Sequence, residues 1–258
     1  MSAEFLSFMK QPTATAVLLA GVVVALAANA QETTPVEPPK TQVPFKVTFS
    51  ETFANDYLAW TGDRIGDGPV QQPYCAVSWG HWTVDGWLSH DLKNNEVHHV
   101  DTSIGYSTKA KPFLGGQVSA TVAARYWNYP SGLFDKDDYL FDLSGSYQGP
   151  VRVTLVFRGL LPNGDHDGGL LTWLSISSKP LKVASVKGWD VTCAPDFAVA
   201  HLTQFFQHET AFAHIKPGFS ISARKGALEL MLWGGYQFGL DGQKPSQAHF
   251  GLQAALRF

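Results

Sequence analysis

The last twelve residues of the chain, 247–258, alternate between apolar and polar side chains. The apolar positions are Ala248, Phe250, Leu252, Ala254, Leu256 and Phe258. The intervening positions, mostly polar, are His249, Gly251, Gln253, Ala255 and Arg257. Because successive side chains of a β-strand point to opposite faces, this pattern predicts a strand with one apolar face. The sequence stops at an aromatic residue of that face.

A terminal strand that ends on Phe resembles the last strand of bacterial outer-membrane β-barrels. The resemblance implies that Phe258 is an assembly signal and that the barrel-assembly machinery is a partner. A bilayer does not tolerate open sheet edges. We therefore expect the last strand to pair with a first strand that begins at Phe45 and to close a barrel.

The first thirty residues predict a secretory signal peptide. An apolar run follows Lys10, and a small-x-small cleavage site ends at Ala30. A transmembrane anchor is the alternative, but the run is shorter than the roughly 20 residues that a spanning helix needs. Residues 31–44 hold four prolines and predict an extended periplasmic tail. The barrel is expected at 45–258, in the bacterial outer membrane.

Several internal segments repeat the alternating pattern, with polar loops rich in Gly, Pro and Asp between them. The clearest alternating segments are 117–126, 139–147, 151–161 and 228–238. The pattern predicts an all-β fold, a transmembrane antiparallel up-and-down β-barrel of about 12 strands, within a range of about 10–14. The count stays open because 183–216 fits two irregular strands, or one strand and a long loop.

A periplasmic β-sandwich or a lipocalin-like barrel is the structural alternative, because its strands alternate too. In such a protein the apolar face points inward. The membrane barrel is favoured because aromatic residues stand at the ends of the apolar faces, as in the interfacial girdles of barrels. Examples are Tyr139, Tyr147, Tyr236, Phe238 and Phe258.

The formal net charge of −3 argues against a nucleic-acid partner, which needs a basic face. Outer-membrane lipid is the expected surrounding, and the sequence leaves the oligomeric state open. Two cysteines, Cys75 and Cys193, fit either a disulfide or two unpaired thiols. No cofactor is expected.

The polar faces of the expected strands carry charges of both signs. If the apolar faces meet lipid, these faces line the lumen, because charges are costly in a bilayer. The expected pore-lining residues are Asp85, Asp101, Arg125, Asp142, Arg152, Arg158, Arg224 and Glu229, with His99 and Arg257 on the same faces. They fit a polar conduit or a salt-bridge network that plugs the barrel. About 12 strands lie between the filled barrels of around eight strands and the open channels of about 16–18.

Metal and catalytic motifs are weak in this chain. His98 and His99 are expected on opposite faces of one strand, which spoils a chelate. Asp165-His166-Asp167 fits a solvated acidic loop, with loose divalent binding as the alternative, and His208-Glu209 lacks the second His of the zinc helix. We therefore predict no metal site. No short motif marks a serine activated by a histidine, so a non-enzymatic protein is favoured over an outer-membrane lipid hydrolase.

Two stretches, Trp82–Tyr106 and Tyr126–Tyr147, resemble the TorF family of porins, also known as the Gcw_chp domain. The second contains an aromatic Tyr-Pro strand end, an acidic loop and a strand that ends in Gly-x-Tyr. The resemblance covers the first half of the barrel and implies an exported barrel with a porin role and no catalytic residues. We therefore predict a porin for the passive diffusion of small solutes. A non-conducting structural or adhesive barrel is the second hypothesis, and the lipid hydrolase is the third.

Overall fold

A computed structural model describes residues 45–66, 68–132, 136–164, 167–207, 210–240, 242 and 244–258. The expected signal peptide and periplasmic tail lie outside these residues. So do Asp165, His166, His208 and Glu209, which the weak metal and catalytic motifs contain.

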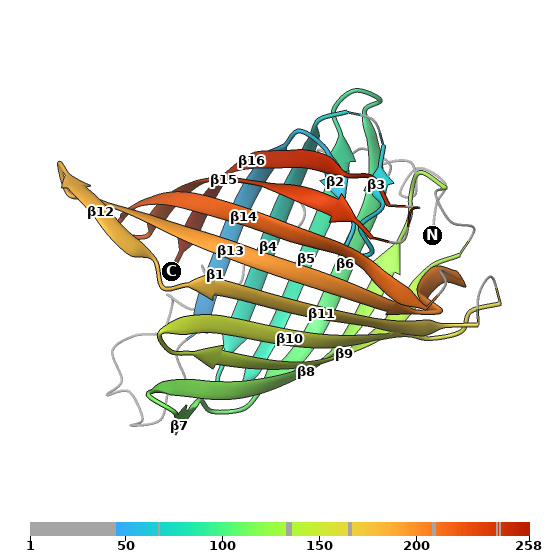
Figure 1. Cartoon of the computed structure of the whole chain (residues 1–258), viewed down its shortest axis with the longest axis horizontal. Coiled ribbons are helices and arrows are strands. Elements are labelled where there is room, and N and C mark those ends of the chain that lie inside the picture. Colours follow the sequence, from blue (N-terminus) through green and yellow to red (C-terminus); the bar gives the residue numbers. More distant parts are fainter. Residues whose placement is uncertain are drawn as a thin grey trace, which may run out of the picture.

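Twelve long antiparallel strands of the described chain close a barrel (Figure 1), as predicted. They are β1 (Phe45–Ala54), β4 (Val70–Trp79), β5 (Trp82–Asp91), β6 (Glu96–Ser107), β8 (Gly116–Asn128), β9 (Asp138–Gln148), β10 (Val151–Leu160), β11 (Gly169–Ser178), β13 (Trp189–Thr203), β14 (Ala211–Lys225), β15 (Leu228–Gly239) and β16 (Gln247–Arg257). Pairing of β1 with β16 closes the seam. Two short strands, β7 (Lys111–Phe113) and β12 (Leu181–Val186), extend hairpins at one rim. No helix of the described residues is long and apolar enough to cross a membrane.

The connections differ between the two rims of the barrel. The loop rim carries the β1–β4, β8–β9, β10–β11, β13–β14 and β15–β16 connections. The turn rim carries tight hairpins such as 149–150 and 226–227, together with both ends of the described chain. In Figure 1 the loop rim lies to the right and the turn rim, with β7 and β12, to the left. Long connections therefore gather mostly at the loop rim, as the sequence predicts, but the short β5–β6 connection also lies there, and the extended β6–β8 and β11–β13 hairpins lie at the turn rim.

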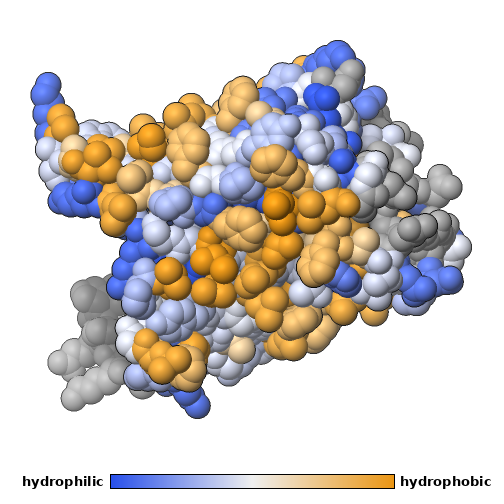
Figure 2. All heavy atoms as spheres, in the orientation of Figure 1, coloured by the Kyte–Doolittle hydropathy of each residue, from blue (hydrophilic) through white to orange (hydrophobic). Residues whose placement is uncertain are grey.

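The apolar faces of the strands point outward. Phe141, Leu232 and Leu252 each expose about half of their surface, at 52%, 50% and 53%. Figure 2 shows apolar side chains gathered over the wall of the barrel, and hydrophilic ones toward both rims. This arrangement contradicts the soluble alternative, in which the same faces fill an interior.

One carboxylate breaks the apolar outer face. Glu51 follows the outward alternation of β1 between Phe49 and Phe53, and faces outward beside the strand neighbours Ala254 and Pro73. The side chain of Gln71 on β4 hydrogen-bonds it. The wall therefore carries one polar pair where lipid is expected.

The segment 183–216 forms the long antiparallel pair β13 and β14, with a single 3-10 turn, η1 (Phe205–Gln207), between them. A register shift at Ala200–His201 breaks the alternation there, and two prolines in the pair, Pro195 and Pro217, remove backbone donors. Of the two cysteine alternatives, the structure has free thiols on β4 and β13.

Candidate functional site in the barrel lumen

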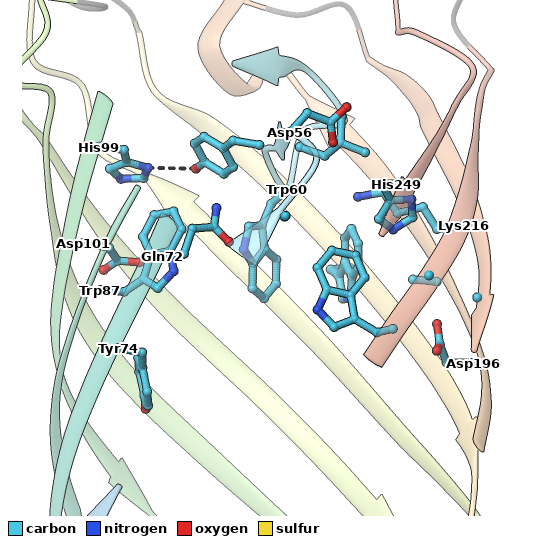
Figure 3. Close-up of a pocket in the computed structure, with 18 of the residues that line it drawn as sticks. Asp56, Trp60, Gln72, Tyr74, Trp87, His99, Asp101, Asp196, Lys216 and His249 are labelled. Carbon is cyan, nitrogen blue, oxygen red and sulfur yellow. Dashed lines mark hydrogen bonds between the residues drawn. The ribbon is translucent and has the colours of Figure 1, made fainter. Parts of the chain in front are cut away.

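The connection between β1 and β4 folds into the barrel instead of standing outside it. We call its residues 55–66 the inner loop. It contains a two-residue hairpin, in which β2 (Tyr57–Leu58) pairs with β3 (Arg64–Ile65). Figure 3 shows Trp60 of the inner loop in the lumen, between a wall that carries His99 and a wall that carries Lys216.

Strands from both halves of the chain hold the inner loop. The hydroxyl oxygen of Tyr57 lies 2.9 Å from Nδ1 of His99. Nε2 of Gln237 donates to the carbonyl oxygen of Gly62 at 2.7 Å. Gly62 has a φ of +89°, and a Cβ there would lie 2.3 Å from Nδ1 of His214. Only glycine fits this close approach.

Ionisation of the inner loop follows from its burial. Burial, and then the charge of Asp101, raises the pKa of the Tyr57 phenol well above its usual range. Burial also raises the pKa of Asp56, which Arg64 and Lys216 lower in turn. Tyr57 is thus a neutral phenol at physiological pH, suited to its contact with an imidazole.

Five of the eight expected pore-lining residues form one cluster of ion pairs. Nε of Arg125 donates to Asp142 at 2.6 Å, and its Nη1 lies 3.0 Å from Asp101 and 3.9 Å from Asp85. Arg158 donates to both carboxylate oxygens of Asp142 at 2.8 Å. Their strands β5, β6, β8, β9 and β10 are consecutive in the wall, so alternation alone brings them together.

The other three expected residues lie apart from this cluster. Arg152, Arg224 and Glu229 belong to the lumen faces of β10, β14 and β15 near the turn rim. Glu229 forms an ion pair with Arg257 at 3.0 Å. Nε of Arg224 donates a hydrogen bond to the carbonyl oxygen of Gly226. Whether any of the eight lines a conducting pore stays a prediction.

The histidine pair departs from the expected alternation. A register shift between β5 and β6 pairs Ser89 with His99 and His90 with Val97, which leaves His98 as a bulged extra residue. Both His98 and His99 are buried. His98 lies 3.7 Å from the buried carboxylate of Asp91. The prediction that the two imidazoles occupy opposite faces was wrong, because a bulge resets the period of the strand.

A cavity of about 520 Å³ lies beside the inner loop, in the middle of the lumen. Five tryptophans line it: Trp60, Trp87, Trp127, Trp173 and Trp233. The charged residues in its wall are Asp56, Asp85, Asp101, Arg125, Asp196 and Lys216. We call this the main cavity. Its size is typical of small-molecule sites, and it combines apolar surface with a few charges.

Two further cavities continue the main cavity. One of about 280 Å³ shares Gln72, Tyr74 and Trp87 with it and reaches Arg257 along β1 and β16. It is lined mostly by polar side chains. The other, of about 270 Å³, shares four residues with the main cavity: Tyr57, Trp60, His99 and Trp127. These four residues, which we call the partition, therefore separate the main cavity from the space toward the loop rim.

An apolar cluster fills part of the barrel near the loop rim. It includes Leu140, Leu160, Leu171, Leu202 and Phe205, all nearly inaccessible to solvent. These leucines occupy lumen-facing positions of β9, β10, β11 and β13. The interior is thus apolar on one side near the loops and polar toward the turn rim.

Most residues of the main cavity were missed by sequence reasoning, and four of them show why. Trp60 lies in a polar Gly-rich loop that carries no sign of folding inward. Trp173, Asp196 and Lys216 alternate correctly on β11, β13 and β14, but bulges and prolines obscure the strands of the last two. Asp196 and Lys216 occupy every-second positions that face the lumen on β13 and β14, and this alternation was the signal that could have found these two residues.

Comparisons with solved structures show the fold. The NanC porin matches with a TM-score of 0.50 at 10% identity, over 83% of this chain and 99% of that one. An outer membrane channel from Pseudomonas putida F1 matches with a TM-score of 0.45 at 11% identity, over 88% and 100%. The β domain of the Bordetella autotransporter BrkA matches with a TM-score of 0.42 at 12% identity, over 84% of this chain and 98% of that one. At such identities the first likeness shows a shared outer-membrane barrel fold and nothing about solutes.

No protein-family model matches the chain, and no curated protein matches it either. The comparisons therefore do not confirm the resemblance to the TorF family, which stays a prediction.

Proposed function

We propose that the protein is an outer-membrane channel that passes small solutes by passive diffusion and is narrowed by its inner loop. The observation that carries the proposal is the succession of cavities through the lumen. Polar space extends from the turn rim to the main cavity, and the four residues of the partition lie between the main cavity and the next cavity toward the loop rim. A barrel that served only as a scaffold has no need of a hollow, charged centre.

The same proposal includes export and assembly. Residues 1–30 direct secretion, residues 31–44 remain in the periplasm, and Phe258 marks the barrel for the assembly machinery. The exposed apolar wall supports contact with outer-membrane lipid, because exposed apolar surface of this extent is stable only when lipid covers it. We propose no catalytic role. The ring nitrogens of His81, His90 and His99 bond to a backbone carbonyl, an asparagine and a tyrosine rather than to a serine.

Planar-bilayer recording of the refolded barrel tests the proposal. We expect small, discrete conductance steps from the wild-type protein and larger steps from Gly62→Ala, because a Cβ at that position collides with His214 and undocks the inner loop. Gly145→Ala is the matched control, since a Cβ there meets nothing within 4 Å. Silence of both the wild type and Gly62→Ala, with correct folding, would overturn the channel.

A non-conducting structural or adhesive barrel is the second candidate. The apolar cluster near the loop rim and the 1% exposure of Arg158 favour it, because both show tight filling of one part of the lumen. The same recordings separate the two candidates. A scaffold stays silent with the inner loop docked or undocked.

A further inference from the structure

Two opposite charges in the main cavity are held by no hydrogen bond or ion pair of the described residues, although Asp56 attracts the positive one at longer range. They are the ammonium of Lys216 on β14 and the carboxylate of Asp196 on β13, and neither takes part in a hydrogen bond or an ion pair there. The ammonium lies over the Trp173 ring, whose centroid is 5.6 Å from Nζ. Unpaired charges in a partly buried site are unfavourable unless something else neutralises them.

The sheet register fixes these two charges beside each other. Asp196 is opposite Gly218, and Lys216 is opposite Ala198, so the two side chains occupy diagonal positions on the lumen face. Diagonal neighbours on adjacent strands stand about 7–8 Å apart. That spacing leaves room for a small ion with two charged ends between them.

The remaining charges of the main cavity all take part in ion pairs. Arg125 pairs with Asp85 and Asp101 on the opposite wall. Asp56 lies 3.6 Å from Arg64 of its own loop. One wall of the cavity therefore offers one positive and one negative group outside any ion pair of the described residues, whereas the charged groups of the other wall are ion-paired.

Aromatic rings surround the two free charges. Trp60 and Trp173 pack with ring centroids 5.2 Å apart, and Trp233 packs against His249 at 5.4 Å. Figure 3 shows Lys216, Asp196 and His249 on one side of the lumen, facing Trp60. The rings provide an apolar surface next to the charges.

We infer that the main cavity binds zwitterionic solutes of the amino-acid class. Asp196 receives the ammonium, Lys216 receives the carboxylate, and the tryptophan rings contact the side chain. The inference deepens the proposed function, since a solute reaches this cavity through the lumen. Charge-assisted hydrogen bonds of both signs select a zwitterion over a cation or an anion of the same shape.

Tryptophan fluorescence of the refolded full chain provides the test, with three ligands of one shape. They are leucine, the cation leucinamide and the anion 4-methylpentanoate. We expect leucine to bind about fivefold or more tightly than either analogue, the contribution of one partly solvated ion pair. Equal binding of all three, or no binding of leucine, would overturn the inference.

Two variants assign the contacts. Asp196→Asn is expected to weaken the binding of leucine and leucinamide by about fivefold and to leave the binding of 4-methylpentanoate unchanged. Lys216→Met is expected to weaken the binding of leucine and 4-methylpentanoate by about fivefold and to leave the binding of leucinamide unchanged. Asp190→Asn is the matched control, since it lies on the lumen side of the same strand but pairs with Lys182 outside the cavity. Leucine affinity that is unchanged in both cavity variants contradicts the assignment. Heat-modifiability on a gel checks that each variant folds.

Liposome swelling with arabinose separates this inference from the channel itself. Leucine binding without any swelling would support the binding site and contradict the channel. Swelling without preferential leucine binding would support the channel and contradict the binding site.

Discussion

The guanidinium group of Arg158 lies over the indole ring of Trp60, with its central carbon 4.3 Å from the ring centroid. One residue belongs to the wall of the barrel and the other to the inner loop. The same guanidinium is held from the wall side by Asp142 and is 5.2 Å from the ring centroid of Trp127. A cation held between a carboxylate and two indole rings fixes the position of the inner loop in the lumen.

Removing that ring is expected to widen the channel. Trp60→Ala deletes a member of the partition and the contact with Arg158, so single-channel conductance should rise severalfold. Stability should fall by only about 1–2 kcal/mol, because the ring is 39% exposed. Trp82→Ala, which removes an outward ring on β5, is the control and should leave conductance unchanged. Unchanged conductance in Trp60→Ala would show that the partition does not limit flow.

The ion-pair cluster should make a large contribution to stability. Asp142→Asn leaves Arg158, which is 1% exposed, without its carboxylate partner, and should destabilise the barrel by about 3–5 kcal/mol. Glu229→Gln breaks a pair with the half-exposed Arg257 and should change stability by less than about 1 kcal/mol. Denaturant unfolding in micelles measures both. Equal effects would mean that water reaches the whole cluster.

The outward face of β10 provides a test of membrane insertion. Leu155→Arg places a charge toward lipid and should destabilise the barrel by about 2–4 kcal/mol near the midplane. Thr154→Arg points to the lumen and should have a much smaller effect. Unfolding from lipid vesicles gives the comparison, and similar losses in the two variants would argue against a membrane face.

Replacing the carboxylate on the outer wall should raise the stability of the barrel, whereas Leu155→Arg should lower it. Glu51→Leu removes a charge from the lipid-facing side of β1 and should stabilise the barrel by about 1–2 kcal/mol at neutral pH. Glu51→Gln, which retains a hydrogen-bonding group for Gln71, should give part of this gain. A loss of stability in Glu51→Leu, measured in the same vesicles, would mean that another molecule covers this position.

The chain terminus combines two roles that variants can separate. Phe258 exchanges backbone hydrogen bonds with Val47 at 2.9 and 3.0 Å across the seam. Deleting Phe258 removes these bonds and the ring, and should leave an exported protein that inserts poorly and accumulates in the periplasm. Phe258→Ala retains the bonds and loses the ring. Fractionation with heat-modifiability measures insertion, and normal insertion of both variants would contradict an assembly signal.

The alternation of the strands was sufficient to predict the barrel and the face of each clear strand. Asp142, Arg152 and Arg158 were placed on the lumen side because a period of two leaves no other choice once the apolar side meets lipid. Sequence reasoning failed where the backbone leaves that period. The bulge at His98 turned two histidines to one side, and no periodicity marks the direction in which a Gly-rich loop such as 61–69 folds.

The site was harder to predict than the wall, for a related reason. Arg125 and its carboxylates lie on consecutive strands, so sequence order predicts their proximity. Trp60 meets Arg158 only because of the path of a loop, and Lys216 is diagonal to Asp196 only through a register that prolines obscure. Contacts set by loop path and register depend on the assembled fold rather than on local pattern.

The hydrogen bond between Gln237 and Gly62 joins residues 175 positions apart. The inner loop follows the first strand, yet its partners Gln237 and Lys244 belong to the last part of the chain. Docking therefore cannot be complete until the carboxyl-terminal strands have arrived, and a barrel with an open seam holds this loop through its remaining contacts, among them those with β6 and β10. Full protease resistance of residues 55–66 should thus appear at the same time as seam closure, so that digestion of the inner loop reports the final step of assembly.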